Sequence, residues 1–218
     1  MAAQSSASRV SSIATPTESF ERFAGLCAII TSISAILYAI SFIILHNVLL
    51  SALFLMLVGL FSLPVLTAVY ERLKEAHAAF ALWAFLLSIV GALGSLIHGG
   101  YDLANAVNPS AAISAAQANL PNTIDPRGLL TFGLAGLGLF FIAWLIGRDH
   151  LFPRALSYLG YLEAVLLIIL YLGRLIILDP KNLVIVIPAL LSGFVFNPIL
   201  YIWLGIALLR GRTSSYDE

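Results

Sequence analysis

Long runs of apolar residues, separated by short polar connections, make up most of the chain beyond its first 22 residues. A helix that crosses the hydrocarbon core of a membrane, about 30 Å thick, needs about 20 consecutive and mainly apolar residues. The segments that meet this length are residues 23–45, 49–70, 79–101, 128–147, 155–178 and 183–209. The pattern therefore predicts an all-α fold, a polytopic transmembrane bundle of six helices.

The polar segments outside these runs predict how the chain is divided into tails, a transmembrane domain and loops. Residues 1–22 are rich in Ser, Thr and Ala and have no apolar run, so we interpret them as a mobile cytoplasmic tail and not as a cleavable signal. Residues 23–209 are the expected transmembrane domain, and residues 210–218 a second cytoplasmic tail. The long outer loop, residues 102–127, contains a predicted short helix capped by Ser110. A lid and a passive surface connection are both compatible with this loop.

Composition and charge support a membrane location and set an orientation. Of the 218 residues, 61% are hydrophobic and 10% charged, against about a quarter charged in ordinary soluble domains. Eleven basic and eleven acidic residues cancel, so there is no electrostatic case for a nucleic-acid partner. Cytoplasmic loops carry an excess of Lys and Arg, and here only Arg127 and Lys181 lie in connections on one side. The connections and tails on the other side carry Arg9, Arg22, Arg72, Lys74, Arg148, Arg154, Arg210 and Arg212. We therefore expect a cell-membrane protein with the lipid bilayer as partner and both termini cytoplasmic.

The stretch LIHGGYDLAN, residues 96–105, places polar groups at the outer end of the third apolar segment. His98 and Asp102 are four residues apart and share a helix face. Arg174 lies about 30 Å along the fifth segment, at the level of His98. Because an intramembrane arginine needs a carboxylate, carbonyl groups or water, we expect Arg174 to pair with Asp102. Extension of its guanidinium to the headgroups and a ligand-binding role are the alternatives.

Glu163 lies about 13 Å from the cytoplasmic end of the fifth segment, too deep for its short side chain to reach water easily. Charged residues at the bilayer centre cost about 2.5–3.5 kcal/mol by insertion scales and are functional candidates by default. We expect Glu163 to face the bundle interior, to keep its proton and to hydrogen-bond a neighbouring helix. Asn197 lies near the same level in the sixth segment, where Pro188 and Pro198 predict a kink.

The remaining motifs do not indicate catalysis. The run GLAGLG, residues 133–138, follows no strand, so close helix packing explains it better than dinucleotide binding. Cys27 is the only cysteine, which excludes an intrachain disulfide. His46, His98 and Asp102 would form a metal site only if the fold brought them together. The sequence therefore predicts no catalytic residue, no metal and no cofactor.

Two stretches carry a resemblance to known proteins. ERFAGLCAII, residues 21–30, and NPILYIWLGIALLRG, residues 197–211, together with the six apolar segments, resemble a group of bacterial six-helix integral-membrane proteins of unknown function. The resemblance covers most of the chain and rests on apolar and Gly-rich motifs. It implies no activity and carries over no functional residue.

Three functions fit these observations. The first is a non-catalytic accessory or structural membrane protein, acting as a homo-oligomer or in a larger membrane complex. The second is a permease or binder for a small polar solute or a proton. Its predicted ligand-binding residues are Glu163, Asn197, Arg174, Asp102 and His98. The third is a membrane-embedded enzyme, which no nucleophile or cofactor motif near these residues favours.

Overall fold

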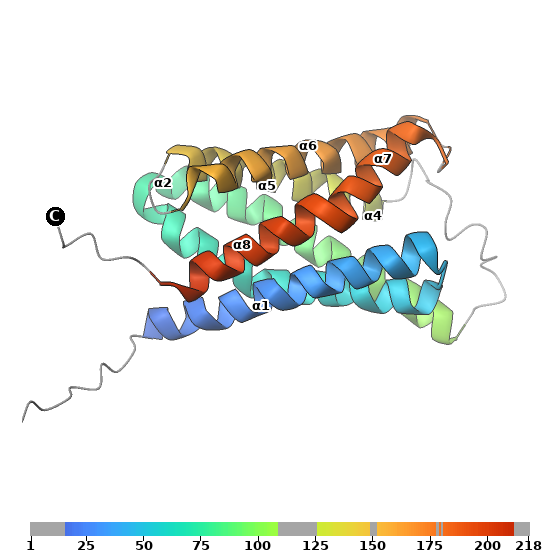
Figure 1. Ribbon diagram of the computed structural model, residues 1–218, viewed down its shortest axis with the longest axis horizontal. Helices are drawn as coiled ribbons and strands as arrows, with labels where there is room; N and C mark the ends of the chain where they lie inside the picture. The colour runs from blue at the N-terminus through green and yellow to red at the C-terminus, as the bar shows by residue number, and fades with distance from the viewer. Residues whose placement is uncertain (1–15, 109–125, 149–151, 178, 180, 212–218) are drawn as a thin grey trace, which may run out of the picture.

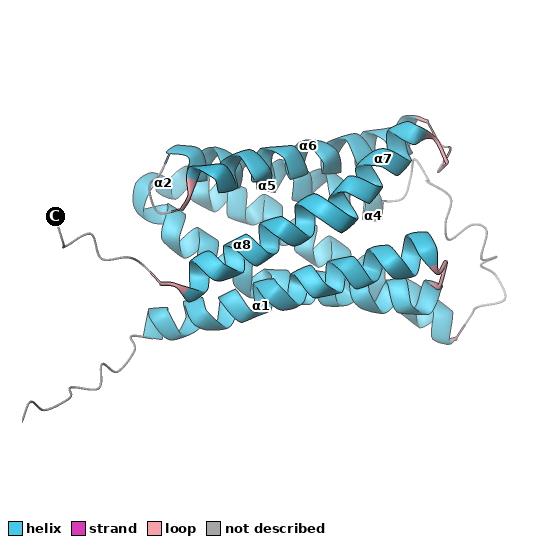
Figure 2. Ribbon diagram, viewed as in Figure 1, coloured by secondary structure: helices cyan, strands magenta, loops and turns pink. Residues whose placement is uncertain are grey.

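The computed structural model describes residues 16–108, 126–148, 152–177, 179 and 181–211. Every regular element in these ranges is helical, and the long helices lie along the long axis of the molecule (Figures 1 and 2). The elements are α1 (Pro16–Ala39), η1 (Ile40–Ile44), α2 (Val48–Val107), α4 (Pro126–Gly128), η2 (Leu129–Leu134), α5 (Ala135–Arg148), α6 (Arg154–Ile176), α7 (Leu183–Leu191), η3 (Ser192–Phe196) and α8 (Asn197–Leu209). The η elements are π-helical turns: η2 joins α4 to α5, η3 joins α7 to α8, and η1 extends the C-terminal end of α1.

Helix α2 is a hairpin of two arms. Its 60 residues would span about 90 Å if straight, but the backbone leaves the helical region at His77 (φ −146°, ψ 71°). A Cβ atom added to Gly59 would lie 2.6 Å from the Ala92 carbonyl oxygen, and one added to Gly99 would lie 2.5 Å from the Met56 nitrogen. The first arm (48–76) and the second arm (78–107) therefore run antiparallel in close contact, as Figure 1 shows.

Helix α1 packs against α2 and α8. A Cβ atom on Gly205 would lie 2.9 Å from the carbonyl oxygen of Gly25, so the missing side chains let α1 and α8 approach backbone to backbone. The apolar core beside this contact includes Ala24, Cys27, Leu73, Leu145, Leu156 and Leu208, all at most 2% exposed. This core thus brings α1 and α8, near the two ends of the described chain, together with α2, α5 and α6.

The outer surface of the bundle is apolar as well. Large side chains such as Phe23, Trp83 and Ile176 are 53%, 52% and 73% exposed, which in water would be an extensive hydrophobic patch. Five described segments are long and apolar enough to cross a membrane by length and composition, with the whole of α2 counted once. These features indicate a membrane protein, and the described residues have an all-helical fold.

Three helix ends differ from the predicted boundaries. Helix α1 begins at Pro16, seven residues before the expected start at 23, because proline suits the first helical turn and Glu18 faces the positive end of the helix dipole. Helix α2 continues to Val107 and α4 begins at Pro126, so the connection is shorter than 102–127. Residues 1–15 and 212–218 and the helix predicted from Ser110 lie outside the described residues.

Candidate functional site

The π-helical turns mark where the helices are irregular. Such turns are rare and are frequent at functional sites. In η3 the Asn197 N–H reaches back to the Ser192 carbonyl, one residue farther than in an α-helix. Pro198 follows directly, and its ring would clash with the carbonyl of the preceding turn in a regular helix. The kink expected from Pro188 and Pro198 therefore takes the form of a widened turn between them.

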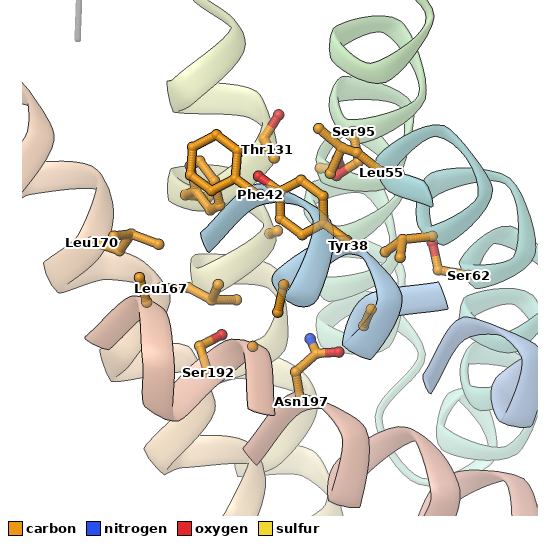
Figure 3. Close-up of a pocket in the computed structure, with 18 of the residues that line it drawn as sticks. Tyr38, Phe42, Leu55, Ser62, Ser95, Thr131, Leu167, Leu170, Ser192 and Asn197 are labelled. Carbon is orange, nitrogen blue, oxygen red and sulfur yellow. The ribbon is translucent and has the colours of Figure 1, made fainter. Parts of the chain in front are cut away.

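All three π-helical turns border one partly open cavity of about 650 Å³. Phe42 of η1, Thr131 of η2 and Ser192 of η3 line it, together with residues of α1, α2, α6, α7 and α8 (Figure 3). Its volume lies within the range of about 300–1,000 Å³ that is typical of small-molecule sites. Along the first arm of α2 the lining runs from Val48 to Val69, about 30 Å of helix. A sphere of 650 Å³ would be only about 11 Å across, so the cavity is elongated.

The walls of the cavity are apolar in effect, although serine is frequent among them. Three wall serines donate to carbonyl groups of their own helix and so present little free polarity to the cavity. They are Ser51 (to Val48, 3.0 Å), Ser62 (to Gly59, 2.9 Å) and Ser95 (to Gly91, 3.3 Å). Leu55, Leu167 and Leu170 supply aliphatic surface between them (Figure 3). A molecule that fits these walls is largely hydrocarbon.

Glu163 lies directly behind the cavity wall and is fully buried. Its Oε1 accepts hydrogen bonds from Ser192 Oγ (2.6 Å) and Asn197 Nδ2 (3.3 Å). Ser192 and Asn197 line the cavity (Figure 3), whereas Glu163 does not. The predicted inward orientation of Glu163 and its bond to the sixth segment are confirmed, and its protonation state stays a prediction. The carboxyl group fixes α6 to η3 and α8 and sets the position of two wall residues.

Two polar atoms of the lining residues have no hydrogen-bond partner within the described ranges. They are Asn197 Oδ1 and Ser88 Oγ, both buried. An unsatisfied buried polar group costs about 1–3 kcal/mol, and such groups are rare in native proteins. An unsatisfied acceptor therefore lies beside the cavity wall, on the same amide group whose nitrogen donates to Glu163.

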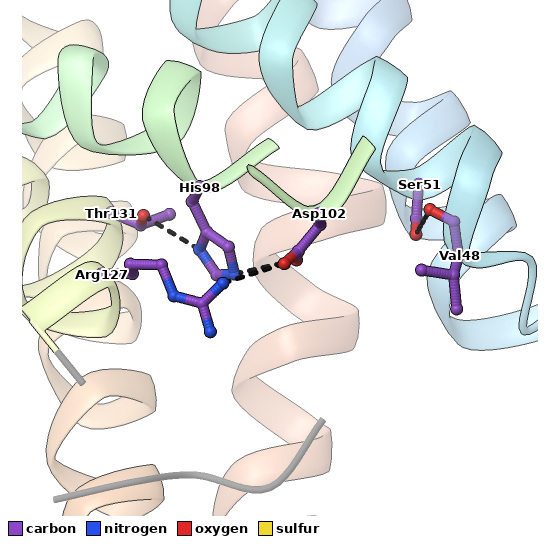
Figure 4. A network of polar contacts seen from close by, with 6 residues as sticks. All are labelled: Val48, Ser51, His98, Asp102, Arg127 and Thr131. Carbon is purple, nitrogen blue, oxygen red and sulfur yellow. Dashed lines mark hydrogen bonds and ion pairs between the residues drawn. The ribbon is translucent and has the colours of Figure 1, made fainter. Parts of the chain in front are cut away.

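A polar network lies near the C-terminal end of the second arm of α2 (Figure 4). Asp102 accepts a hydrogen bond from Arg127 Nη1 at 2.8 Å and lies 3.3 Å from His98 Nε2. His98 Nδ1 lies 3.3 Å from Thr131 Oγ1. Arg127 and Thr131 belong to the α4–η2 segment, so the network holds this segment against α2. The shared face of His98 and Asp102 is thus confirmed, within a cluster that also includes Arg127.

The predicted ion pair between Arg174 and Asp102 was wrong. No carboxylate of the described chain lies within ion-pair distance of Arg174, and Arg127 takes Asp102 instead. The guanidinium carbon of Arg174 lies 6.0 Å from the centroid of the Phe132 ring, and the side chain lines the cavity. The position of Arg174 along its helix predicted its depth. It did not indicate that Arg127, and not Arg174, contacts Asp102.

A metal site from His46, His98 and Asp102 is also not formed. Among the described residues, no group of three His, Cys, Asp or Glu side chains is close enough together to hold a metal ion. The reason is local, because Asp102 and His98 face Arg127 and Thr131.

A buried ion pair at the opposite end was missed from the sequence. Arg72 Nη2 lies 2.6 Å from Glu21 Oε2, and both residues are 2% exposed. Arg72 Nη1 also donates to the Ala207 carbonyl (3.3 Å), and the guanidinium lies 5.3 Å from the Phe152 ring centroid. The pair ties α1 to α2 and α8. The sequence pattern predicts Arg72 in the connection between the second and third apolar segments, and the predicted start at residue 23 leaves Glu21 outside the bundle.

No protein-family model, curated protein or solved structure matches this chain. The resemblance to bacterial six-helix membrane proteins therefore stays a prediction.

Proposed function

We propose that this membrane protein binds a small, mainly apolar molecule in this cavity. The observation that carries the proposal is the cavity itself, which is elongated and apolar-walled. The residues predicted as the mid-membrane site support it, because Asn197 lies in the wall and Glu163 holds Asn197 and Ser192 in place. An accessory or structural protein, the function the sequence alone favours, needs only a tightly packed interior. Transport of the bound molecule, with or without a proton, is the corresponding permease function.

We infer a topology of six membrane crossings with both termini in the cytoplasm of a cell-membrane protein. Each arm of α2 has about 30 residues, or about 45 Å of helix, which is enough to cross the hydrocarbon core. The excess of Lys and Arg, including Arg72 and Lys74 near the His77 bend, supports a cytoplasmic position for that bend. In this topology the cavity residues His46 and Lys181 face the outside.

Cysteine labelling tests this topology. Cys27 is buried, so a Cys27→Ala background removes the native thiol. In intact cells, Asn108→Cys should react with a membrane-impermeant maleimide and Ala78→Cys should not, because only the first lies on the outer side. Ala78→Cys should react after the cells are made permeable. Labelling of Ala78→Cys in intact cells, with Asn108→Cys protected, would contradict the orientation.

Filling the cavity tests the binding function. Ala189 lines the cavity, whereas Ile187 on the same helix is 49% exposed and does not. Native mass spectrometry in a neutral maltoside detergent should detect dodecanol or dodecanoate bound to the wild-type chain. Ala189→Phe should weaken binding of both by about tenfold or more, since the ring occupies the ligand volume. Ile187→Phe adds the same ring outside the cavity and should leave binding unchanged. Equal binding by both variants and the wild type would contradict the proposal.

A further inference from the structure

The outer end of the cavity is positively charged. Arg174 in the last turn of α6 and Lys181 in the connection to α7 both line it, and neither side chain has an ion-pair partner among the described residues. His46 also lines this end and has a left-handed backbone (φ 50°), which is uncommon for a residue other than glycine. Three groups that can donate to an anion therefore line the cavity from connections and helix ends at the same end of the bundle.

The carboxylate that lines the same end does not cancel this charge. Asp102 is neutralised by Arg127, which contacts it at 2.8 Å and comes from outside the lining. His98 occupies its second oxygen at 3.3 Å. Asp179 lies outside the lining, and its Oδ1 accepts from the Lys181 backbone N–H at 3.0 Å. Since Arg127 balances Asp102, the side-chain charges of Arg174 and Lys181 face the cavity without an ion-pair partner among the described residues. An arginine at the edge of a low-dielectric cavity binds carboxylate and phosphate groups strongly and in a defined geometry.

Beyond these cations the cavity is apolar and elongated. Its lining follows the first arm of α2 for about 30 Å and is made of aliphatic side chains and of serines that bond their own helix. A compact anion would leave this surface without contacts, and a neutral hydrocarbon would leave the cations without a counter-charge. An amphiphile with one hydrocarbon chain and one anionic group matches both parts.

We propose that the ligand is a single-chain anionic amphiphile, with its carboxylate or phosphate at Arg174 and Lys181 and its chain along the apolar walls. This inference rests on the proposed binding function and specifies its ligand class. Free fatty acids and one-chain phospholipids share this chemistry, and dodecanoate and a dodecanoyl lysophosphatidate are the corresponding probes. Dodecanol has a chain of the same length without a charge, and acetate has the charge without the chain.

The experiment titrates the full-length protein in a neutral maltoside detergent and measures the bound fraction of each probe by native mass spectrometry. The wild type should bind at least one of the two anionic probes about tenfold or more tightly than dodecanol and should not retain acetate. Arg174→Gln should bring the affinity for the anion close to that for dodecanol, and Arg174→Lys should restore part of it. Lys181→Gln provides a second variant at an exposed position, where folding is not at risk. Arg154→Gln removes an exposed charge from the other end of the same helix and should have no effect.

The outcomes separate this inference from the function on which it rests. Equal binding of dodecanol and of both anionic probes, unchanged in Arg174→Gln and Lys181→Gln, would overturn the ligand class and leave cavity binding intact. A loss in Arg154→Gln equal to that in Arg174→Gln would also overturn it, because binding would then follow net charge. Binding that is insensitive to Ala189→Phe would overturn the proposed function itself. Preference for dodecanoate over the lysophosphatidate, or the reverse, identifies which source supplies the anionic group.

Discussion

Glu21→Ala should lower the free energy of unfolding by about 3–5 kcal/mol, because it leaves the guanidinium of Arg72 buried without its carboxylate. Arg72 is only 2% exposed, and its other contacts within the described residues are the Ala207 carbonyl at 3.3 Å and the ring of Phe152. A neutral carbonyl cannot replace the charge of a carboxylate in a low dielectric. The measurement is unfolding of the purified protein in mixed micelles, titrated with dodecyl sulfate.

Two further variants show whether burial causes this loss. In a double-mutant cycle, Glu21→Leu combined with Arg72→Leu should lower the free energy of unfolding by less than the sum of the two single changes. Each single change leaves one buried charge unpaired, whereas the double variant has no charge at either position. Lys74 and Glu71 form an ion pair of the same length, 2.6 Å, but their side chains are 40% and 37% exposed. Glu71→Ala should therefore have a far smaller effect. Similar losses for Glu21→Ala and Glu71→Ala would contradict the assignment of the energy to burial.

The parts of the fold that sequence predicted are those decided by length and hydrophobicity. A segment of about 20 apolar residues has few alternatives to a helix in a membrane, because every backbone N–H and C=O must be bonded internally. Both 49–70 and 79–101 lie within the arms of α2, and the bend at His77 falls between them. The helix ends were less predictable, because Pro16 and Val107 extend their helices through polar sequence.

Depth along a helix predicted part of the site. It placed Glu163 and Asn197 at a common level, and their side chains meet at 3.3 Å. Helix depth predicted the wrong partner for Asp102. Whether Arg174 or Arg127 contacts Asp102 depends on how the α4–η2 segment packs against α2. This contact is a matter of tertiary packing, to which no local pattern in the sequence corresponds.

The cavity and its π-helical turns could not be predicted. A π-helical turn differs from an α-helical one by a single residue, so it hardly alters the hydrophobic pattern. Only η3 had a local signal, in Pro198. The volume of the cavity depends on how closely several helices approach, and single glycines decide this: a Cβ atom on Gly193 would lie 2.9 Å from that of Ala39. Apolar periodicity shows which faces are buried but not whether they fill the space between them.

Glu163→Ala should lower the free energy of unfolding by about 2–4 kcal/mol, because it leaves one buried and one partly buried donor without an acceptor, at about 1–3 kcal/mol each. These donors are Ser192 Oγ and Asn197 Nδ2. Since both residues line the cavity, the variant should also weaken ligand binding by about tenfold. Unfolding in mixed micelles measures the first effect, and native mass spectrometry with dodecanol and dodecanoate the second.

Glu163→Gln is the matched variant that separates a structural from a proton-linked role of this carboxyl group. Glutamine keeps the length of the side chain and an oxygen that accepts from Ser192 and Asn197, but it has no proton to release. If Glu163 only holds η3 and α8 against α6, Glu163→Gln should stay close to the wild type in stability and in binding at every pH, while Glu163→Ala loses both. Ser192→Ala on the Glu163→Ala background should then add little, because its partner is already gone. A Glu163→Gln variant that unfolds like the wild type but no longer shows the wild type's pH dependence of binding or uptake would contradict the structural role. The acid would then take part in proton-linked movement of the ligand.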